Sequence, residues 1–345
     1  MKFSKPLIQW YLQNKRDLPW RKNTNPYSVW LSEIMLQQTR VAQGMPYFFK
    51  FIEAFPTVKH LANAPEEQVL KLWQGLGYYS RARNLHATAK HIAYNLNGIF
   101  PDNYNDLLKL KGVGNYTAAA IASICYGEEI PVVDGNVYRV LSRYFGIETD
   151  ISSSGAKAEF TALAAAHLPK GKASEFNQAM MEFGALQCVP KNPNCYTCVL
   201  SAHCVAYNTG KVQQLPVKLK KTKVTNRYFN YLVVNDAEGK SVVNKRSGKG
   251  IWHNLYEFPL LETETLVSSN AAKELIDNFE GFNFTPTTTT LLTNTIVHKL
   301  SHQHLHIRFW EVATNTLVAG ATDRDFIKQY PFPIVIHNFI EKHWD

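Results

Sequence analysis

The sequence predicts two domains: a mainly α-helical domain over residues 1–208 and an α+β domain over residues 227–345. Three observations predict this division. Apolar residues recur every three or four positions up to residue 208, as in helices with one buried face. Residues 209–226 contain five lysines, one proline and no acidic residue, a composition typical of a basic linker. Beyond residue 227, runs rich in aromatic and β-branched residues predict strands.

Helix boundaries in the first domain follow from polar caps and prolines. Asn25-Pro26, Asn63-Ala64-Pro65 and Pro101-Asp102 each place a cap or a proline at the start of an apolar periodic run. The helical spacing covers residues 7–12, 29–41, 47–55, 69–73, 82–96, 102–109 and 115–126. The last two runs are joined by a glycine-containing turn at residues 111–114.

The second domain mixes strands and helices. Strands are predicted at residues 228–234, 241–246 and 304–312, and helices at residues 271–279 and 333–342. The threonine-rich residues 285–290 are expected to form a loop. The lysines of the linker either contact a nucleic-acid backbone or are simply solvated, and the sequence leaves both interpretations open.

Composition restricts the partners. The chain of 345 residues carries a formal net charge of +9 and a pI near 9.1, which favours a polyanionic partner. It contains no run of about eighteen apolar residues and no apolar segment at its N-terminus. We therefore expect no membrane partner and no signal peptide, and a cytoplasmic protein. We also expect a monomer.

The turn between the last two helices of the first domain carries Lys111, Gly112 and Gly114. Glycines let the backbone approach a partner closely and leave amide N–H groups free at a helix start. With Lys111 beside them, these amides form a seat for an anion such as a DNA phosphate. An ordinary turn between helices is the alternative. Asp134, an acid twenty residues further on at the start of the next helix, favours the DNA-binding interpretation.

Four of the five cysteines lie close together, in the spacing Cys188-x6-Cys195-x2-Cys198-x5-Cys204. Free cysteines rarely gather in this way, so the spacing predicts a metal centre with four thiolate ligands. Zinc and a [4Fe–4S] cluster both accept four cysteines, and geometry does not decide between them. Cys125 stands alone in an alanine-rich helix and is expected to be a core residue.

Glu33 and Asp134 are candidate acid–base residues. On a helix, three of the four neighbours of Glu33 at three and four positions are apolar, so its carboxyl should be partly buried and its pKa raised. Asp134 precedes a helix, where it is a favoured N-cap and where the helix dipole keeps it ionised. A protonated carboxyl beside an ionised one suits the protonation of a leaving base and the stabilisation of a sugar cation.

Six motifs in order resemble those of the helix-hairpin-helix DNA glycosylases, and in particular the adenine DNA glycosylase (MutY) family. They are LPWR (18–21), WLSEIMLQQT (30–39), GLGYYSRARN (75–84), GVGNYT (112–117), VDGNV (133–137) and FNQAM (176–180). The resemblance extends over residues 8–208, and the cysteine spacing matches the cluster loop of endonuclease-III-like glycosylases. It implies a helix-hairpin-helix glycosylase domain with a [4Fe–4S] cluster bound by the four cysteines.

The same resemblance implies roles for individual residues. Glu33 protonates adenine, and Asp134 stabilises or covalently captures the sugar. The residues that hydrogen-bond around Asp134 are Tyr116 and Asn136. Those that line the adenine pocket are Trp20, Arg21, Leu36 and Gln178, and those that wedge into the base stack are Gln38 and Tyr78. Contacts to the DNA backbone come from Lys111, Gly112, Gly114 and Lys191. The implied partner is double-stranded DNA containing adenine opposite 8-oxoguanine or guanine.

The second domain is, by the same resemblance, related to the Nudix fold. Its glutamates between residues 248 and 281 lack the Arg-Glu and Glu-Glu arrangement that Nudix hydrolases need for Mg²⁺, so we expect no hydrolysis there. The implied role is inspection of 8-oxoguanine through Ser301 and His302, although Leu300 stands where the family usually has phenylalanine. His302, His304 and His306 alternate on one strand face, and metal binding there is the alternative.

Two other functions compete with this interpretation. The first is a glycosylase/lyase acting on damaged pyrimidines. In the similar endonuclease III pattern a lysine stands at the position of Tyr116 and no acid at that of Glu33, and a phenol forms no Schiff base. A catalytically silent binder of DNA structures would not need both carboxylates. The resemblance therefore implies a monofunctional adenine DNA glycosylase that excises the base and leaves an abasic site.

Overall fold

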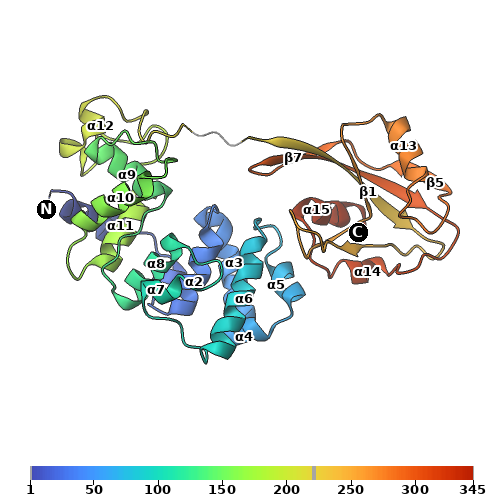
Figure 1. The fold of residues 1–345 in the computed structure, drawn as a ribbon, viewed down its shortest axis with the longest axis horizontal. Helices are drawn as coiled ribbons and strands as arrows, with labels where there is room; N and C mark the ends of the chain where they lie inside the picture. The colour runs from blue at the N-terminus through green and yellow to red at the C-terminus, as the bar shows by residue number, and fades with distance from the viewer. Residues whose placement is uncertain (1, 220–222, 345) are drawn as a thin grey trace. The chain divides into compact units, whose positions relative to one another are not determined.

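In the computed structural model the chain forms two compact units, and the first of them consists of helices (Figure 1). The structure describes residues 2–219 and 223–344. Unit 1 comprises Met1–Asn63 and Asn84–Lys220, and unit 2 comprises Ala64–Arg83 and Lys221–Asp345. The segment Ala64–Arg83, which the sequence analysis assigns to the helical domain, thus packs with the C-terminal part of the chain.

Unit 1 contains short helices joined by tight turns. Its elements are α1 (Ser4–Asn14), η1 (Pro19–Arg21), α2 (Pro26–Leu36), α3 (Val41–Ala54), α4 (Val58–Asn63), α7 (Tyr104–Leu107), α8 (Asn115–Tyr126), α9 (Gly135–Phe145), α10 (Ala156–His167), α11 (Ala173–Leu186), η2 (Ser201–His203) and α12 (Val205–Asn208). Helix α6 (Ser80–Asn95) begins in unit 2 and continues in unit 1. Within residues 2–219 and 223–344, every helix is too short or too polar to cross a membrane.

The boundaries of α2 show how the sequence positions its residues. Asn25 accepts hydrogen bonds from the backbone N–H groups of Tyr27 and Ser28, and Pro26 occupies the first turn, as predicted. The predicted run over residues 29–41 is not a single helix, because α2 ends at Leu36 and α3 begins at Val41. Between them Gln38 has a φ of +55°, a left-handed conformation that a right-handed helix cannot contain.

Two apolar clusters bring the helices of unit 1 together. α11 packs against α1 and α9 and buries Phe176, Met180 and Phe183. α8 packs against α2, and its buried Ala119 and Ala120 allow a close approach of neighbouring backbone. As a result α2, α8, α9 and α11, which carry the candidate catalytic residues, lie in one unit.

Part of the expected linker at residues 209–226 is attached to unit 1. The Leu215 carbonyl accepts a hydrogen bond from Arg143 Nε at 2.9 Å, and the Val217 carbonyl accepts one from the backbone of Ile151 at 3.0 Å. Lys218 and Lys223 are exposed, whereas Lys220 and Lys221 lie outside the described residues.

Unit 2 is an α+β unit with a mixed sheet. Its elements are α5 (Glu66–Leu72), β1 (Thr225–Asn235), β2 (Asn244–Lys245), β3 (Tyr256–Glu257), β4 (Leu260–Thr263), α13 (Ser269–Asp277), β5 (Thr288–Leu291), β6 (Ile296–Lys299), β7 (Gln303–Ala313), α14 (Arg324–Ile327) and α15 (Ile334–His343). The main sheet has the order β4-β1-β7-β5, and β6 also pairs with β7. β1 and β7 are parallel, with Tyr231 opposite Phe309, and the other pairs are antiparallel.

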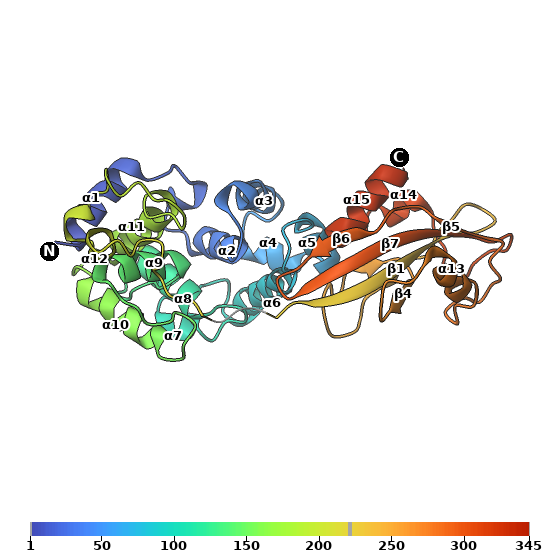
Figure 2. The same cartoon turned by 90° about the horizontal axis from the view of Figure 1, so that it is seen from above.

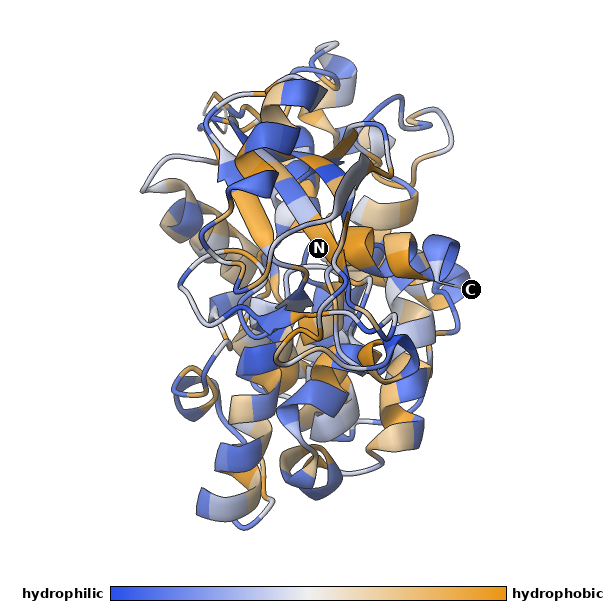
Figure 3. Cartoon of the chain, turned by 90° about the vertical axis from the view of Figure 1, so that its right-hand side faces the viewer, coloured by the Kyte–Doolittle hydropathy of each residue, from blue (hydrophilic) through white to orange (hydrophobic). Residues whose placement is uncertain are grey.

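Helices cover both faces of this sheet (Figure 2). On one face Leu232 and Trp310 pack with Ile276 of α13. On the other face Phe309 stacks on Phe339 of α15, with ring centroids 3.9 Å apart. Successive strand residues point to opposite faces, which explains why neighbouring residues of β7 serve both cores. Helix α15 itself is hydrophobic in its first turn and hydrophilic at its C-terminal end (Figure 3).

The sequence locates the long strands of unit 2 correctly and errs on the short ones. β1 and β7 cover the predicted strands at 228–234 and 304–312. The predicted strand at 241–246 is reduced to Asn244–Lys245 plus an isolated bridge at Ser241, which pairs with Thr322. The expected loop at 285–290 is wrong in part: Thr288–Leu291 forms β5, because its β-branched threonines pair with the edge of β7.

Polar contacts join Ala64–Arg83 to the rest of unit 2. The Gln74 side-chain oxygen accepts from the Phe332 backbone N–H at 2.8 Å, and the Tyr79 hydroxyl donates to the Phe332 carbonyl at 3.2 Å. Lys71 Nζ donates to the carbonyls of Lys328 and Tyr330. Three polar side chains of this segment thus form hydrogen bonds with backbone groups of the C-terminal residues.

Candidate active site

The two candidate carboxylates line one cavity. Glu33 lies on α2 and Asp134 directly precedes α9, and both line a cavity of about 540 Å³ in unit 1. Tyr116, from the first turn of α8, lines it as well. The same three side chains also line a second cavity of about 1080 Å³. The carboxylates therefore stand where two cavities adjoin.

Glu33 is a buried acid. The residue is only 8% exposed, and burial raises the pKa of its carboxyl to about 7. A hydrogen bond from Tyr116 and the positive charge of Arg21 lower this pKa, while the charge of Asp134 adds to the rise. The burial and raised pKa expected from the sequence are observed. Near neutral pH about half of the molecules hold a proton on Glu33 that can be donated.

Asp134 is the N-cap of α9, as expected. Its Oδ1 accepts hydrogen bonds from the backbone N–H groups of Asn136 at 2.9 Å and Val137 at 2.8 Å. Its Oδ2 accepts from Asn136 Nδ2 at 2.8 Å. Burial raises the pKa of Asp134 above its ordinary value, and the hydrogen bonds from Val137 and Asn136 oppose that rise. Both oxygens are thus held in fixed positions at the cavity.

Tyr116 presents a neutral phenol. Burial, together with the charges of Glu33 and Asp134, raises the pKa of Tyr116 well above its ordinary value. Its hydroxyl lies 3.2 Å from Met181 Sδ and is hydrogen-bonded to Glu33. Asn136, not Tyr116, supplies the side-chain hydrogen bond to Asp134. Tyr116 therefore orients the acid on α2.

The residues expected to surround adenine lie around the smaller cavity. They are Trp20, Arg21, Leu36 and Gln178, and Asn136 lines the cavity with them. Trp20 is held by edge contact with the Phe48 ring, at a centroid distance of 5.1 Å. Gln178 Oε1 accepts from the Tyr11 hydroxyl at 3.0 Å. Arg21 Nη1 is buried without a hydrogen-bond partner among the described residues, so it is a donor available to a ligand.

The two expected wedge residues belong to different units. Gln38 is exposed and lines the larger cavity of unit 1. Tyr78 belongs to unit 2, where it is 44% exposed and has a φ of +49°. The Arg81 guanidinium lies 5.5 Å from the centre of its ring. Both wedge candidates thus share a left-handed backbone and an exposed side chain.

The glycine turn has the geometry expected of a backbone that must approach a partner. Gly112 has a φ of +79°, and a Cβ there would lie 2.7 Å from Asn84 Cβ. Gly114 is the N-cap of α8 and lines the larger cavity. Lys111 is exposed beside them, and its carbonyl is fixed by the Thr88 hydroxyl at 2.7 Å. Lys191, in the cysteine loop, is also exposed.

The four cysteines of residues 188–204 have free thiols and line one pocket, together with Arg143. Arg143 is 2% exposed, and its Nη1 lies 3.5 Å from Cys188 Sγ. Its other donors reach the carbonyls of Val189, Pro190 and Leu215. In the described part of the chain, no group of three or more His, Cys, Asp or Glu side chains has an arrangement that could hold a metal ion. Four soft donors around a pocket with one buried cation nevertheless have the chemistry required for an anionic thiolate cluster.

Comparison with known proteins identifies a family for each of two parts of the chain. Residues 31–165 match the HhH-GPD superfamily of base excision DNA repair proteins, and residues 230–342 match the NUDIX domain. An adenine DNA glycosylase of Buchnera aphidicola (subsp. Schizaphis graminum) is 36% identical over 306 residues, which cover 88% of this chain and 86% of that protein. The chain belongs to the adenine DNA glycosylases. As a member of this family it is an N-glycosylase hydrolase of base excision DNA repair.

Other relatives agree with this family assignment. The human adenine DNA glycosylase is 42% identical over 222 residues, which cover 62% of this chain and 41% of the human protein. A thermostable thymine-DNA glycosylase has a similar structure over 60% of this chain, with 30% identity and a TM-score of 0.56. An endonuclease III in a non-covalent DNA complex shares the fold of the same portion at 23% identity and a TM-score of 0.52. The helix-hairpin-helix and Nudix-like architecture of this adenine DNA glycosylase is therefore confirmed.

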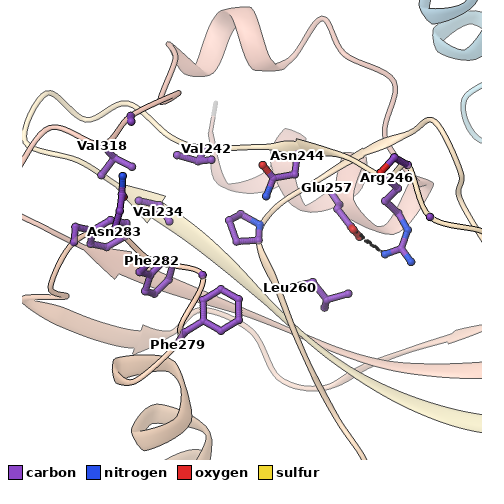
Figure 4. A pocket seen from close by; sticks show the side chains of 16 residues that line it. Val234, Val242, Asn244, Arg246, Glu257, Leu260, Phe279, Phe282, Asn283 and Val318 are labelled. Atoms are coloured by element: carbon purple, nitrogen blue, oxygen red, sulfur yellow. Dashed lines mark hydrogen bonds and ion pairs between the residues drawn. The ribbon is translucent and has the colours of Figure 1, made fainter.

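Unit 2 of the adenine DNA glycosylase contains a pocket of about 740 Å³ (Figure 4). Arg246 and Glu257 form an ion pair of 2.6 Å in its wall, and Glu257 also accepts from the Tyr231 hydroxyl at 3.0 Å. The Phe279 and Phe282 rings line another part of the wall (Figure 4). The carboxylate of this pocket is thus neutralised by an arginine. The absence of nucleotide hydrolysis stays a prediction.

The residues proposed to inspect 8-oxoguanine are exposed before β7. Ser301 Oγ and His302 Nδ1 lie 3.2 Å apart. His306 stacks on Tyr228 and lies 3.2 Å from Asn226 Oδ1, contacts that orient its ring. His302, His304 and His306 form no metal-ligand group within the described residues.

Sequence reasoning missed two residues that hold the site in place. Asn177 on α11 is fully buried, accepts from the Val132 backbone at 3.0 Å and donates to the Ile130 carbonyl at 2.8 Å, fixing the chain that leads to Asp134. Glu182, one turn beyond Gln178, is also fully buried. A signal existed, because Glu182 stands in the apolar run 180–183 as Glu33 does in 29–36.

Proposed function

We propose that this adenine DNA glycosylase removes adenine paired with 8-oxoguanine or guanine in duplex DNA and leaves an uncut abasic site. The observation that carries the proposal is the shared cavity of Glu33 and Asp134, which differ in their surroundings. Glu33 has a single hydrogen-bonding neighbour that lowers its pKa, whereas Asp134 accepts three hydrogen bonds. Unlike surroundings of this kind assign an acid and a stabilising carboxylate to one reaction.

Glu33 acts as the general acid. A flipped adenine in the smaller cavity receives its proton on a ring nitrogen, which makes the base a better leaving group. Tyr116 orients the Glu33 carboxyl through their hydrogen bond. Extrusion of the nucleotide is required because the glycosidic bond is inaccessible in a stacked duplex, and it costs a few kcal/mol. Gln38 and Tyr78 are each proposed to wedge into the base stack, and such contacts offset this cost.

Asp134 stabilises the sugar cation as the bond breaks, or captures it covalently before water enters. Asn136 and the first turn of α9 keep its carboxylate facing the cavity. The base is held by Trp20, Arg21, Leu36 and Gln178, which line the same cavity. Arg21 Nη1 has no hydrogen-bond partner among residues 2–219 and 223–344, and it is suited to a ring nitrogen of adenine.

The proposed reaction stops at base release. A strand-cleaving lyase uses an amine that forms a Schiff base with the sugar. Among the described residues around the smaller cavity there is no lysine, and Tyr116 offers a phenol. Lys157 lines the larger cavity, so a Lys157→Ala variant serves as the control in any search for residual lyase activity.

Two further parts of the chain complete the proposal. Lys111, Gly112, Gly114 and Lys191 bind the DNA backbone through amides and ammonium groups. Cys188, Cys195, Cys198 and Cys204 hold a [4Fe–4S] cluster, which when bound cross-links the loop structurally. Arg143 provides a buried positive charge that compensates the thiolates. The enzyme acts as a monomer on DNA in the cytoplasm.

Ser301 and His302 read the base opposite adenine. Both are exposed side chains with hydrogen-bonding groups 3.2 Å apart, able to form paired contacts with a purine edge. This assignment separates the chemistry, which is in unit 1, from discrimination of the opposite base, which is in unit 2.

The test is single-turnover base release from duplexes with adenine opposite 8-oxoguanine, guanine or thymine, followed by alkali to reveal abasic sites. We expect release with 8-oxoguanine and guanine, little with thymine, and strand breaks only after alkali. A Glu33→Gln variant should lose at least about 100-fold in rate while still binding DNA. Borohydride trapping of a covalent adduct, absent in Lys157→Ala, would instead support a glycosylase/lyase.

A further inference from the structure

Glu182 is a fully buried carboxylate beside the candidate adenine pocket. Its Oε2 lies 2.9 Å from Arg21 Nη2 and 2.7 Å from Arg16 Nη2. Its Oε1 accepts from Arg16 Nε at 2.8 Å and from the Arg16 backbone at 2.9 Å. Hydrogen bonds from both arginines hold the pKa of Glu182 at about 2, although burial acts in the opposite direction. A permanent negative charge is therefore enclosed by two guanidinium groups.

This ion-pair group is connected to the recognition residues. Gln178 lies one turn before Glu182 on α11, and its Oε1 accepts from the Tyr11 hydroxyl. The Arg21 guanidinium lies 5.8 Å from the centre of the Tyr11 ring. Arg21 is thus fixed from two sides, by the Glu182 carboxylate and by an aromatic face.

Arg21 is the cation whose charge acts on Glu33. The groups that influence Glu33 are Tyr116 of α8, Arg21 of η1 and Asp134 before α9, and Cys125 of α8 senses its charge in turn. Arg40 also lines the cavity. Arg21 therefore acts on the Glu33 carboxyl as well as on Glu182, and an ion pair between Arg21 and Glu33 would favour the deprotonated form of Glu33.

We propose that Glu182 is a positioning residue that holds and neutralises the Arg21 guanidinium, so that Glu33 keeps its proton. This rests on the proposed function of Glu33 as the general acid. Without the charge of Glu182, the field of Arg21 on Glu33 is no longer compensated, and the Glu33 carboxylate form becomes more favourable. Glu33 then releases its proton, and stops acting as the general acid, at a lower pH than in the native enzyme.

The test is the pH profile of single-turnover adenine release by Glu182→Gln at saturating enzyme, so that affinity does not enter. We expect its descending limb to move to lower pH. A displacement of one pH unit gives about a tenfold lower rate at pH 8 and a rate within about 10% at pH 5. In the double variant Glu182→Gln/Arg21→Gln the limb should return toward the native position. Glu148→Gln, which removes an exposed carboxylate of unit 1, should leave the limb unchanged.

An equal loss of rate at every pH in folded Glu182→Gln would overturn the proposal, as would a shift that persists without Arg21. If Glu182→Gln does not fold, the single variant Arg21→Gln provides the test. The descending limb of its pH profile should move to higher pH, and an unmoved limb refutes the inference. Native enzyme that releases no adenine, or that shows no descending limb, contradicts the proposed function itself.

Discussion

Glu33 is the residue whose burial has the clearest thermodynamic consequence. Its carboxyl has an ordinary pKa of 4.5 and a pKa of about 7 in the folded protein. Below pH 4.5 both folded and unfolded chains are protonated, so stability is unaffected. As the pH rises to 7 the unfolded chain releases its proton first, and the folded state loses up to about 3 kcal/mol relative to it. The raised pKa that suits Glu33 to the proposed role of general acid therefore also makes it destabilising at alkaline pH.

A Glu33→Gln variant should remove this pH dependence. Urea unfolding at pH 5 and pH 8 measures it, and the native protein should lose roughly 2 kcal/mol more between these values than the variant does. Glu148→Gln is the control, because Glu148 is exposed and paired with Lys211. Equal pH dependence in the native protein and in Glu33→Gln would mean that Glu33 is solvated.

The sequence was sufficient for the residues that obey a local rule. The burial of Glu33 follows from apolar neighbours on its own helix, and the N-cap role of Asp134 follows from its place before α9. Their convergence and the pairing of Glu182 with Arg16 depend on contacts across 101 and 166 positions, which no local pattern contains. The resemblance to a family supplied the first of these, and the second required the structure.

At the scale of elements, the turn between α7 and α8 combines two glycines with different functions. Gly112 has a positive φ and no room for a Cβ, because Asn84 lies against it. Gly114 has a φ of −94° and nothing within 4 Å of a Cβ position. Gly112 is needed for the fold of the turn, whereas Gly114 leaves open space toward the larger cavity.

We expect Gly112→Ala to destabilise unit 1 by roughly 1–3 kcal/mol, since a left-handed conformation and a close contact are both strained. Gly114→Ala is the matched variant and should unfold like the native protein. The Gly114→Ala substitution should weaken DNA binding without lowering stability, and fluorescence anisotropy measures that affinity. Native affinity in Gly114→Ala would show that the backbone does not approach phosphate there.

The cysteine loop offers a second prediction at this scale. Protein purified anaerobically should contain about four irons and four sulfides per chain. Cys198→Ser should lose most of this content, while Cys125→Ser should keep it, because Cys125 lies apart on α8. If metal analysis found one zinc per chain, the four cysteines would bind zinc and not an iron–sulfur cluster.

Prediction succeeded for some elements and missed the bounds of others, such as α3, which begins at Val41 and was predicted only from residue 47. The sequence identifies α8, β1, β7 and α15 closely because each carries a complete apolar period. It extends the helix of α2 to residue 41, because the apolar spacing continues through the left-handed Gln38, and it starts the next helix at residue 47 although α3 begins at Val41. It assigns β5 to a loop, because strand formation there depends on the neighbouring edge of β7.

At the scale of the whole molecule, the proposal places phosphate binding and discrimination of the opposite base in different units. Lys111 is in unit 1, and Ser301 and His302 are in unit 2. A charged side chain that contacts phosphate contributes similarly to the affinity for every DNA sequence. A side chain that contacts a base edge contributes to the affinity for one particular base. Variants in the two units should therefore produce different patterns of loss.

Lys111→Ala should weaken binding to all duplexes by a similar factor and reduce the salt slope by about one. Ser301→Ala and His302→Ala should instead lower the preference for 8-oxoguanine over guanine opposite adenine. Dissociation constants for both duplexes at several salt concentrations distinguish the two patterns. A uniform loss of affinity in Ser301→Ala would remove unit 2 from the recognition of the opposite base.

The packing of Ala64–Arg83 with the C-terminal residues bears on how the enzyme can be dissected. A fragment that ends in the linker would retain Lys71, Gln74 and Tyr79 but lose the Phe332, Lys328 and Tyr330 backbone groups that satisfy them. Such a truncation strips the partner from a segment that bears Tyr78. Any slow excision by the shortened enzyme would then reflect the loss of these contacts to the segment of Tyr78 as well as the loss of Ser301 and His302.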